Sequence, residues 1–490
     1  MTAEFADAVR RRGLPPRAWP FHMPGHRGGA GASDAARALL GRAALAADVT
    51  ELQGLDYLHD AQHELAAAQA RAAGVFGADR TWFLVNGATV GNLAAVLAIA
   101  SAGEHDRDDV IVMRASHRST YGGITLAGAR PRYLVSGYDD DLAMALAPTV
   151  DEASSLLAAN PGARAIHLTS PSYYGVCADV AAFAELAHAH GVPLIVDEAH
   201  GTHFASGAPG LPSSALACGA DLVVQSPHKT LSSLTQSSLL HVRGDLVEHD
   251  VVDRWLGILQ STSPSSLLLA SLDLAIDAFE AAGAPPWERA VATADETRAR
   301  LSMLSGVVVL GAELVGRGGV AAIDPTKVVI DVSGTGRNGY DVARSMTATH
   351  GCYPEFADPR RIVVSIGPAD DAMTVDLLVA AIAAALDALP SRGSAAPRAG
   401  RQALPHAPLT PRQASGRAGE PVAVASAAGR LAAEYVIPYP PGVPLAVPGE
   451  RLDADLLATL AELRAAGARI VGPVDRSGGT LRCLLDEAAQ

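Results

Sequence analysis

The feature that most constrains the fold of this chain is a regular alternation of apolar, β-branched runs with Ala- and Leu-rich helical segments, which begins near residue 76. The apolar runs cover residues 81–85, 109–113, 163–168, 193–200 and 221–226. Continuous apolar runs are typical of strands buried on both faces, and their alternation with helices predicts βαβ units. We therefore expect an α/β protein built on a mostly parallel central sheet.

Each predicted strand is followed by a polar or glycine-containing segment. These five segments are NGATVGN, RASHRS, TSPSYYG, DEAHGTHF and SPHKT. Function in a parallel sheet gathers at the carboxyl ends of the strands, which meet at one edge. We expect the five segments to converge on one crevice, which is the candidate site.

Changes in composition divide the chain into five parts. A second set of apolar and helical patterns follows a long Ala-rich helix predicted over residues 271–300, and helical patterns return at 425–434 and 453–466. A stretch rich in Pro, Arg, Ala and Ser has no apolar period and is predicted to be a linker. The predicted parts are an N-terminal segment (1–75), a large domain (76–270), a smaller α/β domain (271–390), the linker (391–420) and a short C-terminal domain (421–490).

Composition also excludes several classes of function. The chain has 490 residues with 38 Lys and Arg against 52 Asp and Glu, and this net charge of −14 argues against nucleic acid or an anionic membrane as partner. Its four cysteines lack paired spacing, which indicates reduced thiols and no disulfide framework or zinc ribbon. Residues 1–20 lack the apolar core of a secretory signal, and the longest apolar stretch, 93–102, is too short to span a bilayer. We expect a cytoplasmic enzyme acting on a small molecule.

Two residues near predicted strand ends suggest cofactor chemistry. Lys229, in SPHKT, stands beside small hydroxyl residues, where a desolvated amine could form a Schiff base with an aldehyde cofactor. Asp197 closes the run PLIVD, and a buried carboxylate needs a cationic partner such as the protonated ring nitrogen of pyridoxal phosphate (PLP). The alternatives are a solvated surface lysine and an aspartate that caps a helix or forms a structural ion pair.

Two further segments are compatible with the same cofactor. Residues 86–92 form a small-residue turn before a predicted helix, where backbone amides and the Thr89 hydroxyl could bind phosphate. His117 follows the strand at 109–113 and could stack on a flat ring. Taken singly, an ordinary capped turn and a structural histidine explain these residues as well.

The motifs together resemble the PLP-dependent Orn/Lys/Arg decarboxylase family, which has the aspartate-aminotransferase-like fold (fold type I). The resemblance covers most of the chain outside the linker and the extreme N-terminus. It rests on FHMPGHRGG (21–29), DVTELQGLDYLH (48–59), FLVNGATVGN (83–92), ASHRST (115–120), VDEAHGTHF (196–204), QSPHKTLSSLTQ (225–236), QSTSPSSLLLASLD (260–273) and IPYPPGVPLAVPGE (437–450).

Carried over position by position, the resemblance implies a role for each site residue. Lys229 would form the Schiff base, Asp197 would pair with the pyridine nitrogen, and His200 would lie beside the phenolic oxygen or the substrate carboxylate. The ring would lie between His117 and Ala199, and the phosphate would be held by Ala88, Thr89, Ser226 and His228. In a homodimer or higher oligomer, the neighbouring subunit's phosphate would be reached by Thr262 and Ser263.

The implied activity is decarboxylation of arginine, lysine or ornithine to the corresponding amine and carbon dioxide, a lyase reaction of polyamine biosynthesis. An acidic residue must meet the distal cation of such a substrate. Glu355 matches the family's small-domain glutamate, with Asp56 and Glu51 as alternatives. The proton returned to Cα could come from Lys229, His200 or another acid.

Three other interpretations remain open at this point. Arg360 and Arg361 stand where aminotransferases place a carboxylate-binding arginine, so an aminotransferase or another PLP lyase is one alternative. A catalytically silent, PLP-binding regulatory homologue is a second, against which retention of Lys229 argues. A metal site is the third, but the spacings His22/His26 and His200/His203 lack an evident third ligand, so none is expected.

Overall fold

The computed structural model describes residues 3–13, 20–100, 109–391 and 406–485. Its centre is a seven-stranded sheet in which β10 alone runs against the other strands, so the expected mostly parallel sheet is confirmed. In spatial order the strands are β1 (Arg80–Leu84), β10 (Ser238–Val242), β9 (Leu222–Gln225), β8 (Leu194–Glu198), β6 (Ala163–Thr169), β2 (Asp109–Met113) and β3 (Arg130–Leu134).

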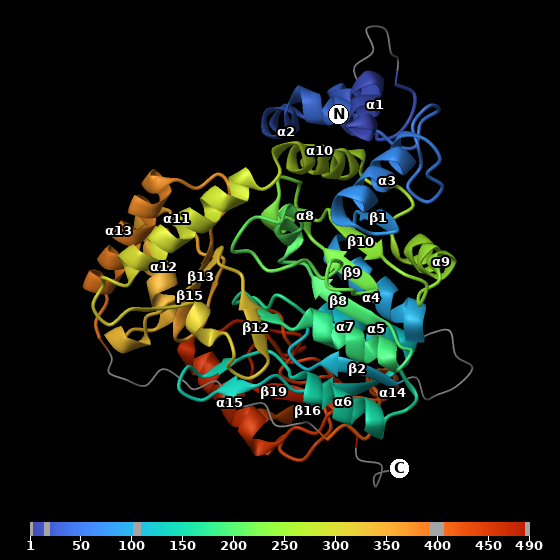
Figure 1. Cartoon of the computed structure of the whole chain (residues 1–490). Helices are drawn as coiled ribbons and strands as arrows, with labels where there is room; N and C mark the ends of the chain where they lie inside the picture. Colours follow the sequence, from blue (N-terminus) through green and yellow to red (C-terminus); the bar gives the residue numbers. More distant parts are fainter. Residues whose placement is uncertain (1–2, 14–19, 101–108, 392–405, 486–490) are drawn as a thin grey trace.

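Helices cover both faces of this sheet (Figure 1). Alternate residues of the strands enter separate apolar clusters on the two faces, as expected for strands buried on both sides. One face packs against α4 (Gly87–Ala100), α5 (Arg118–Ala127) and α9 (His249–Leu259). The other face packs against α3 (Glu64–Phe76), α6 (Val150–Ala159), α7 (Val180–Ala189) and α10 (Ser266–Ala282).

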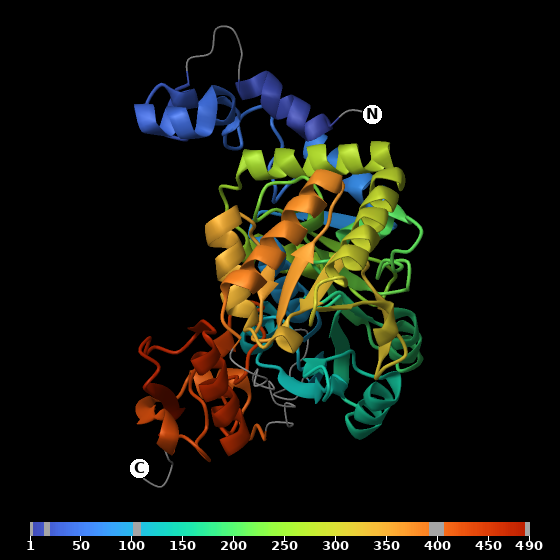
Figure 2. The same ribbon diagram turned by 90° about the vertical axis from the view of Figure 1, so that its left-hand side faces the viewer.

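The N-terminal helices α1 (Glu4–Gly13) and α2 (Asp34–Ala47) lie against α10. The backbone N–H of Ala6 donates to Asp273 Oδ2 at 3.0 Å, and that of Val49 donates to Ser266 Oγ at 3.0 Å. Figure 2 shows this pair of helices projecting beyond the body of the molecule.

The smaller domain has an antiparallel sheet of β11 (Val308–Leu310), β13 (Lys327–Asp331), β15 (Arg361–Ser365) and β14 (Phe356–Ala357). It packs against α11 (Pro285–Leu301), α12 (Gly339–His350) and α13 (Ala372–Ala388). The single helix predicted over 271–300 is wrong: α10 ends before Gly283, which has φ 61°, and α11 starts at Pro285. β12 (Val320–Ile323) pairs with β7 (Val176–Ala178) and ties the two domains together.

The C-terminal domain contains the predicted helix at 453–466 but not the one at 425–434, which is a short 3-10 turn (Val424–Ser426) followed by isolated bridges at Leu431 and Ala432. Its elements are α14 (Pro411–Ser415), β16 (Gly419–Ala423), β17 (Ile437–Pro438), α15 (Ala454–Ala466), β18 (Ile470–Val471) and β19 (Thr480–Leu484). Residues 392–405 of the predicted linker lie outside the described residues, and the limits of the five predicted parts remain predictions.

A buried cation fixes the C-terminal domain to the large domain. Arg114 follows β2 and donates to the carbonyls of Pro444 and Leu445 at 2.8 and 3.1 Å, and its guanidinium pairs with Glu450 at 3.1 Å. Removing one member of such a pair costs about 3–5 kcal/mol. Further elements are β4 (Tyr138–Asp139), β5 (Met144–Ala145), α8 (Pro227–Thr230) and short 3-10 helices. No helix within the described residues has the length and apolar character needed to cross a membrane.

Candidate active site

A cavity of about 420 Å³ opens at the carboxyl ends of the parallel strands. All five polar segments that follow the predicted strands contribute to its lining, so the expected convergence is confirmed. The lining includes ten of the predicted site residues: Ala88, Thr89, His117, Asp197, Ala199, His200, Ser226, His228, Lys229 and Glu355. Thr262 and Ser263 are exposed and lie outside it.

Asp197 at the end of β8 is the buried carboxylate of this cavity. Its Oδ2 accepts from Asn92 Nδ2 at 2.8 Å and its Oδ1 accepts from the Ala199 N–H at 3.1 Å. Asp197 makes no ion pair with a cationic side chain of the described residues. A buried charge in this state fits a ligand that brings a cation.

Asn92 connects Asp197 to the histidine on the opposite wall. It is buried on α4, and its Nδ2 also donates to Ser119 Oγ at 3.0 Å. Ser119 Oγ lies 2.8 Å from His117 Nδ1. The Asn92 amide therefore orients the Asp197 carboxylate directly. It orients the His117 imidazole through the Ser119 hydroxyl.

His117 begins α5 as its N-cap, with Nδ1 accepting from the Ser119 N–H at 3.3 Å. Burial lowers the pKa of His117 to about 4, although Asp197 opposes that shift, so the ring is neutral at neutral pH. Gly442 of the C-terminal domain packs against this ring: with φ +94°, a Cβ there would lie 3.2 Å from His117 Cδ2. The IPYPPG motif thus belongs to the site.

Lys229 and His200 form the reactive pair. Lys229 Nζ lies 3.0 Å from His200 Nε2. The lysine is reachable from the cavity, yet protein atoms around its amine desolvate it and lower its pKa, against the attraction of Asp197. Burial, followed by the nearby Lys229 charge, holds the pKa of His200 well below its usual value, so the neutral imidazole accepts from the ammonium.

The turn at residues 86–92 opens α4 beside the cavity. Gly87 has φ +71° and donates its N–H to Gln236 O at 2.8 Å, which aligns the helix start. Ala88 and Thr89 lie in the first turn of the helix, where N–H groups have no intrahelical acceptor. Across the cavity, buried Ser226 Oγ lies 3.2 Å from Ser238 Oγ. These donors suit an anionic phosphate.

The residues therefore fit PLP on three counts. A lysine with a lowered pKa suits its aldehyde, an unpaired buried carboxylate suits its protonated ring nitrogen, and a helix start with hydroxyl neighbours suits its phosphate. The lysine, the carboxylate and the phosphate-binding donors follow different strands of one sheet. They share one cavity because the carboxyl ends of these strands lie at the same edge.

Comparison with known proteins now decides the family. Residues 16–372 match the family described as Orn/Lys/Arg decarboxylase, major domain, and residues 396–471 match its C-terminal domain. The chain belongs to the Orn/Lys/Arg decarboxylase family. The arginine decarboxylase of Bacillus subtilis is 34% identical over 96% of this chain and 95% of its own length.

Solved structures agree on the fold of this Orn/Lys/Arg decarboxylase family member. The constitutive lysine decarboxylase of E. coli superposes with a TM-score of 0.79 at 21% identity, covering 99% of this chain and 82% of that chain. A structure of SPT with PLP gives 0.52 at 16% identity, covering 67% of this chain and 77% of that one. The family and its fold are those of PLP-dependent enzymes, and the predicted fold class is confirmed.

Glu355 reaches the cavity from the small domain, next to Phe356. Asp56 instead accepts the N–H groups of His63 and Leu65 at 2.7 and 3.0 Å and so caps α3. Neither Asp56 nor Glu51 lines the cavity. Of the three acidic candidates, the geometry places only Glu355 where a substrate could meet it.

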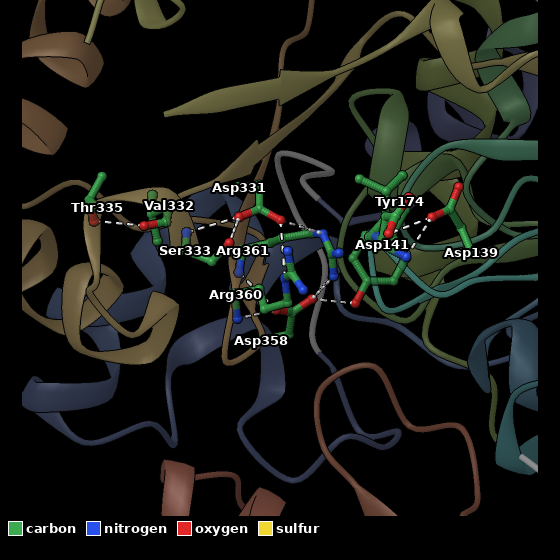
Figure 3. A network of polar contacts seen from close by, with 11 residues as sticks. Asp139, Asp141, Tyr174, Asp331, Val332, Ser333, Thr335, Asp358, Arg360 and Arg361 are labelled. Atoms are coloured by element: carbon green, nitrogen blue, oxygen red, sulfur yellow. Dashed lines mark hydrogen bonds and ion pairs between the residues drawn. The ribbon is translucent and has the colours of Figure 1, made fainter. Parts of the chain in front are cut away.

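The arginine behind the aminotransferase alternative lies elsewhere. Arg361 is buried in a network with Asp331 at 3.5 Å and Asp358 at 3.2 Å, drawn in Figure 3, and it lines a neighbouring cavity rather than this one. Asp358 also accepts from Tyr174 Oη at 2.7 Å. Arg361 thus has anionic partners of its own within the protein.

The histidines weighed as metal ligands have other partners. His203 Nε2 lies 3.4 Å from Asp324 Oδ1 and 3.3 Å from Thr326 Oγ1, and His26 Nε2 lies 3.1 Å from Asp48. Within the described ranges of the chain, no group of three or more His, Cys, Asp or Glu is arranged to hold a metal ion.

Sequence reasoning assigned no role to several residues of the cavity. They include Asn92, Tyr173, Gln236 and Tyr439. All four lie in segments that the sequence analysis identified, NGATVGN, TSPSYYG, QSPHKTLSSLTQ and IPYPPG, so these segments predicted the site although the individual contacts were not evident.

Proposed function

We propose that this protein catalyses the PLP-dependent decarboxylation of a basic L-amino acid, with arginine as the first candidate, to the corresponding amine and carbon dioxide. The observation that carries the proposal is the pairing across one cavity of an unpaired buried carboxylate, Asp197, with a reachable, desolvated lysine, Lys229. The choice of arginine is supported by the 34% identical relative named arginine decarboxylase.

PLP, when bound, supplies a protonated ring that accepts the electrons left behind when a carboxylate departs. Asp197 would hold the proton on the ring nitrogen, because its carboxylate is buried and positioned by Asn92 and Ala199. His117 and Ala199 would contact the ring. Ala88, Thr89, Ser226 and His228 would bind the phosphate.

Lys229 and His200 move the protons of the reaction. Neutral His200 accepts a hydrogen bond from Lys229 across the 3.0 Å contact and orients its amine, and the burial that lowers the pKa of Lys229 favours the neutral, nucleophilic form. The pair then returns a proton to Cα from Lys229 Nζ or His200 Nε2. Tyr173 packs on the His200 ring at 4.6 Å and keeps it in place.

Substrate recognition falls to Tyr173 of the large domain and to groups from the two other domains. Glu355 pairs with the distal cation of the substrate. Phe356, Tyr173 and Tyr439 give the cavity apolar and aromatic walls, which disfavour a charged carboxylate and so favour its loss.

We propose a homodimer or higher oligomer as the active assembly. Thr262 and Ser263 are exposed, and their segment is held by Tyr57 Oη on Thr262 O at 3.1 Å and by His59 on Ser261 O at 2.9 Å. This arrangement supports a role of the segment at the phosphate of a second copy. The four cysteines are free thiols, which supports a cytoplasmic location, and the amine product suits polyamine biosynthesis.

The test uses purified protein loaded with PLP and supplied separately with arginine, lysine and ornithine. We expect carbon dioxide and the matching amine from one of them, and no product from Lys229→Ala. Borohydride reduction followed by mass spectrometry should attach the cofactor at residue 229. The chain has only two lysines, 229 and 327, so Lys327→Met is the matched control and should retain the attachment. Attachment without carbon dioxide release from any basic amino acid would refute the proposed activity.

A further inference from the structure

A second cavity, of about 250 Å³, lies beside the catalytic one where the three domains meet. Its walls come from the segments after β2 and β3 and the β4–β5 pair of the large domain, from the start of β15 in the small domain, and from α15 and residues 438–445 of the C-terminal domain. The two cavities share the wall residues Thr169, Tyr173, Pro440 and Pro441. The proposed reaction uses no group that lines the second cavity alone.

Most of the second cavity has apolar or aromatic walls. They include Met113 and Met144 of the large domain, Tyr340 of the small domain, and Val443 and Leu463 of the C-terminal domain. An apolar cavity of about 150 Å³ already holds benzene. The larger volume here therefore accepts a ring or a short chain together with one polar group.

The polar part of the lining is rich in arginine. The charged side chains that line the second cavity are Arg114, Asp358, Arg360 and Arg361. Arg114 is already paired with Glu450 and two backbone carbonyls. Arg361 is buried, and its Nη1 donates to Asp358 Oδ2 at 3.2 Å, whereas its Nη2 has no hydrogen-bond partner among the described residues. Arg361 is thus held in place with part of its donor set unused.

Arg360 has the most donors to spare. Its side chain is 18% exposed, and a guanidinium has five N–H donors. Within the described ranges of the chain, side-chain hydrogen bonding of Arg360 is limited to Nε, which lies 3.4 Å from Asp331 Oδ2. Asp331 also accepts from the Ser333 N–H at 2.9 Å, and Asp358 accepts from Tyr174 Oη at 2.7 Å (Figure 3). The network therefore holds more guanidinium donors than its two carboxylates accept.

These observations define the chemistry of a ligand. In charge, Asp331 and Asp358 balance Arg360 and Arg361, so this end of the cavity lacks hydrogen-bond acceptors. A carboxylate offers two oxygens in the planar arrangement that a guanidinium fork matches. We propose that the second cavity binds a small apolar carboxylic acid as its anion, with the carboxylate on Arg360 and the apolar part against the walls from the three domains.

An occupant of this site would bridge the three domains and touch the wall of the catalytic cavity. Thr459 and Leu463 lie one turn apart on α15 and both line the second cavity. Tyr173, in the shared wall, packs on the His200 ring at 4.6 Å. A ligand that binds only the folded protein raises its unfolding temperature by mass action. This readout needs no turnover, so the inference does not depend on the proposed activity.

The probe is 3-phenylpropionate, and its amide, 3-phenylpropanamide, is the matched uncharged compound. Each is titrated by calorimetry into the full-length protein kept saturated with PLP near neutral pH, and thermal unfolding is followed at the same concentrations. We expect the acid to bind and to raise the unfolding temperature. The amide should bind about tenfold more weakly, because hydrogen bonds between charged groups are about twice as strong as neutral ones.

Two variants, each with a control, locate the probe. Arg360→Met removes the guanidinium and should weaken binding of the acid about tenfold, whereas Arg344→Met removes an exposed arginine of α12 outside the cavity and should leave the affinity unchanged. Thr459→Phe fills the cavity from α15, and Ala458→Phe adds the same ring at the neighbouring exposed position. Binding should be lost in Thr459→Phe and kept in Ala458→Phe.

The possible results separate clearly. An acid that does not bind the unmodified protein, or an amide that binds as tightly, overturns the inference. Normal binding of the acid to Thr459→Phe also overturns it, because the probe then lies elsewhere, as it would in the catalytic cavity. If Arg360→Met does not fold, the comparison of acid with amide and the Thr459→Phe result still decide. Failure to release carbon dioxide from any basic amino acid would refute the proposed function and leave this inference standing.

Discussion

The two sides of the active-site cavity are built differently. The floor is formed by strand ends and helix α4 of the large domain, where Asp197, Asn92 and Ser226 are buried and hydrogen-bonded. The rim is formed by loops of the small and C-terminal domains, where Glu355 is exposed and Tyr439 is nearly half exposed. The proposed cofactor-binding groups thus come mainly from one sheet and its helices, whereas the proposed substrate-facing groups depend on how three domains meet.

The largest expected effect is on the floor, at Asn92. Asn92→Leu keeps the size of the side chain but leaves Asp197 Oδ2 and Ser119 Oγ without their donor. An unpaired buried polar group costs about 1–3 kcal/mol. We expect weaker PLP binding and a fall in kcat that together amount to about 5- to 150-fold, measured by cofactor titration and initial rates.

The matched control for this variant is Asn160→Leu. Asn160 ends α6, and its side-chain amide donates only to Leu156 O at 2.8 Å. PLP affinity should be unchanged in that variant. An Asn92→Leu protein with normal affinity and rate would mean that Asp197 does not depend on its neighbour, contrary to the description of the floor.

An intermediate effect is expected in the sheet beneath the floor, and it concerns the stability of the protein at acidic pH. His241 on β10 is fully buried, and burial lowers its pKa to about 3. The unfolded chain, with a pKa near 6.5, binds more protons between these values, so stability is complete above about pH 6.5 and falls as the pH drops toward 3. One such group contributes a slope of up to about 1.4 kcal/mol per pH unit.

His241→Gln should remove that contribution and flatten the pH dependence of the free energy of unfolding, measured with denaturant between pH 4 and 7. His350→Gln offers a comparison, because it replaces an exposed histidine and not a buried one. Equal slopes in the original protein and His241→Gln would show that this histidine is not held neutral by the fold.

The smallest expected effect is on the rim. Glu355 is solvent-exposed, so its attraction for a substrate cation is screened and contributes about 1 kcal/mol. Glu355→Gln should raise KM for the preferred basic amino acid about fivefold and leave kcat nearly unchanged. Steady-state kinetics at two salt concentrations measure this, with Glu51→Gln as the control. A large loss of kcat instead would place Glu355 among the groups of the floor.

The same contrast explains what the sequence could predict. Lys229, Asp197 and His117 lie at or shortly after apolar runs. Because function gathers at the carboxyl ends of parallel strands, this placement predicted that the three share one site. The family resemblance supplied their roles. Asn92 bonds a partner 105 residues away, and Gly442 approaches His117 from another domain, so both contacts depend on tertiary packing that no local pattern encodes. The helix predicted over 425–434 failed for a related reason, because buried Ala432 forms a β-bridge with Cys483 instead of packing from a helical face.

The contact of Gly442 with His117 bears on how the enzyme is made. The two residues are 442 − 117 = 325 positions apart in a chain of 490. Synthesis runs from the N-terminus, so the segment that packs against His117 is made well after the strands that carry Asp197 and Lys229. A chain that ends before this segment would carry Lys229 and Asp197 without the Gly442 backbone that packs against His117.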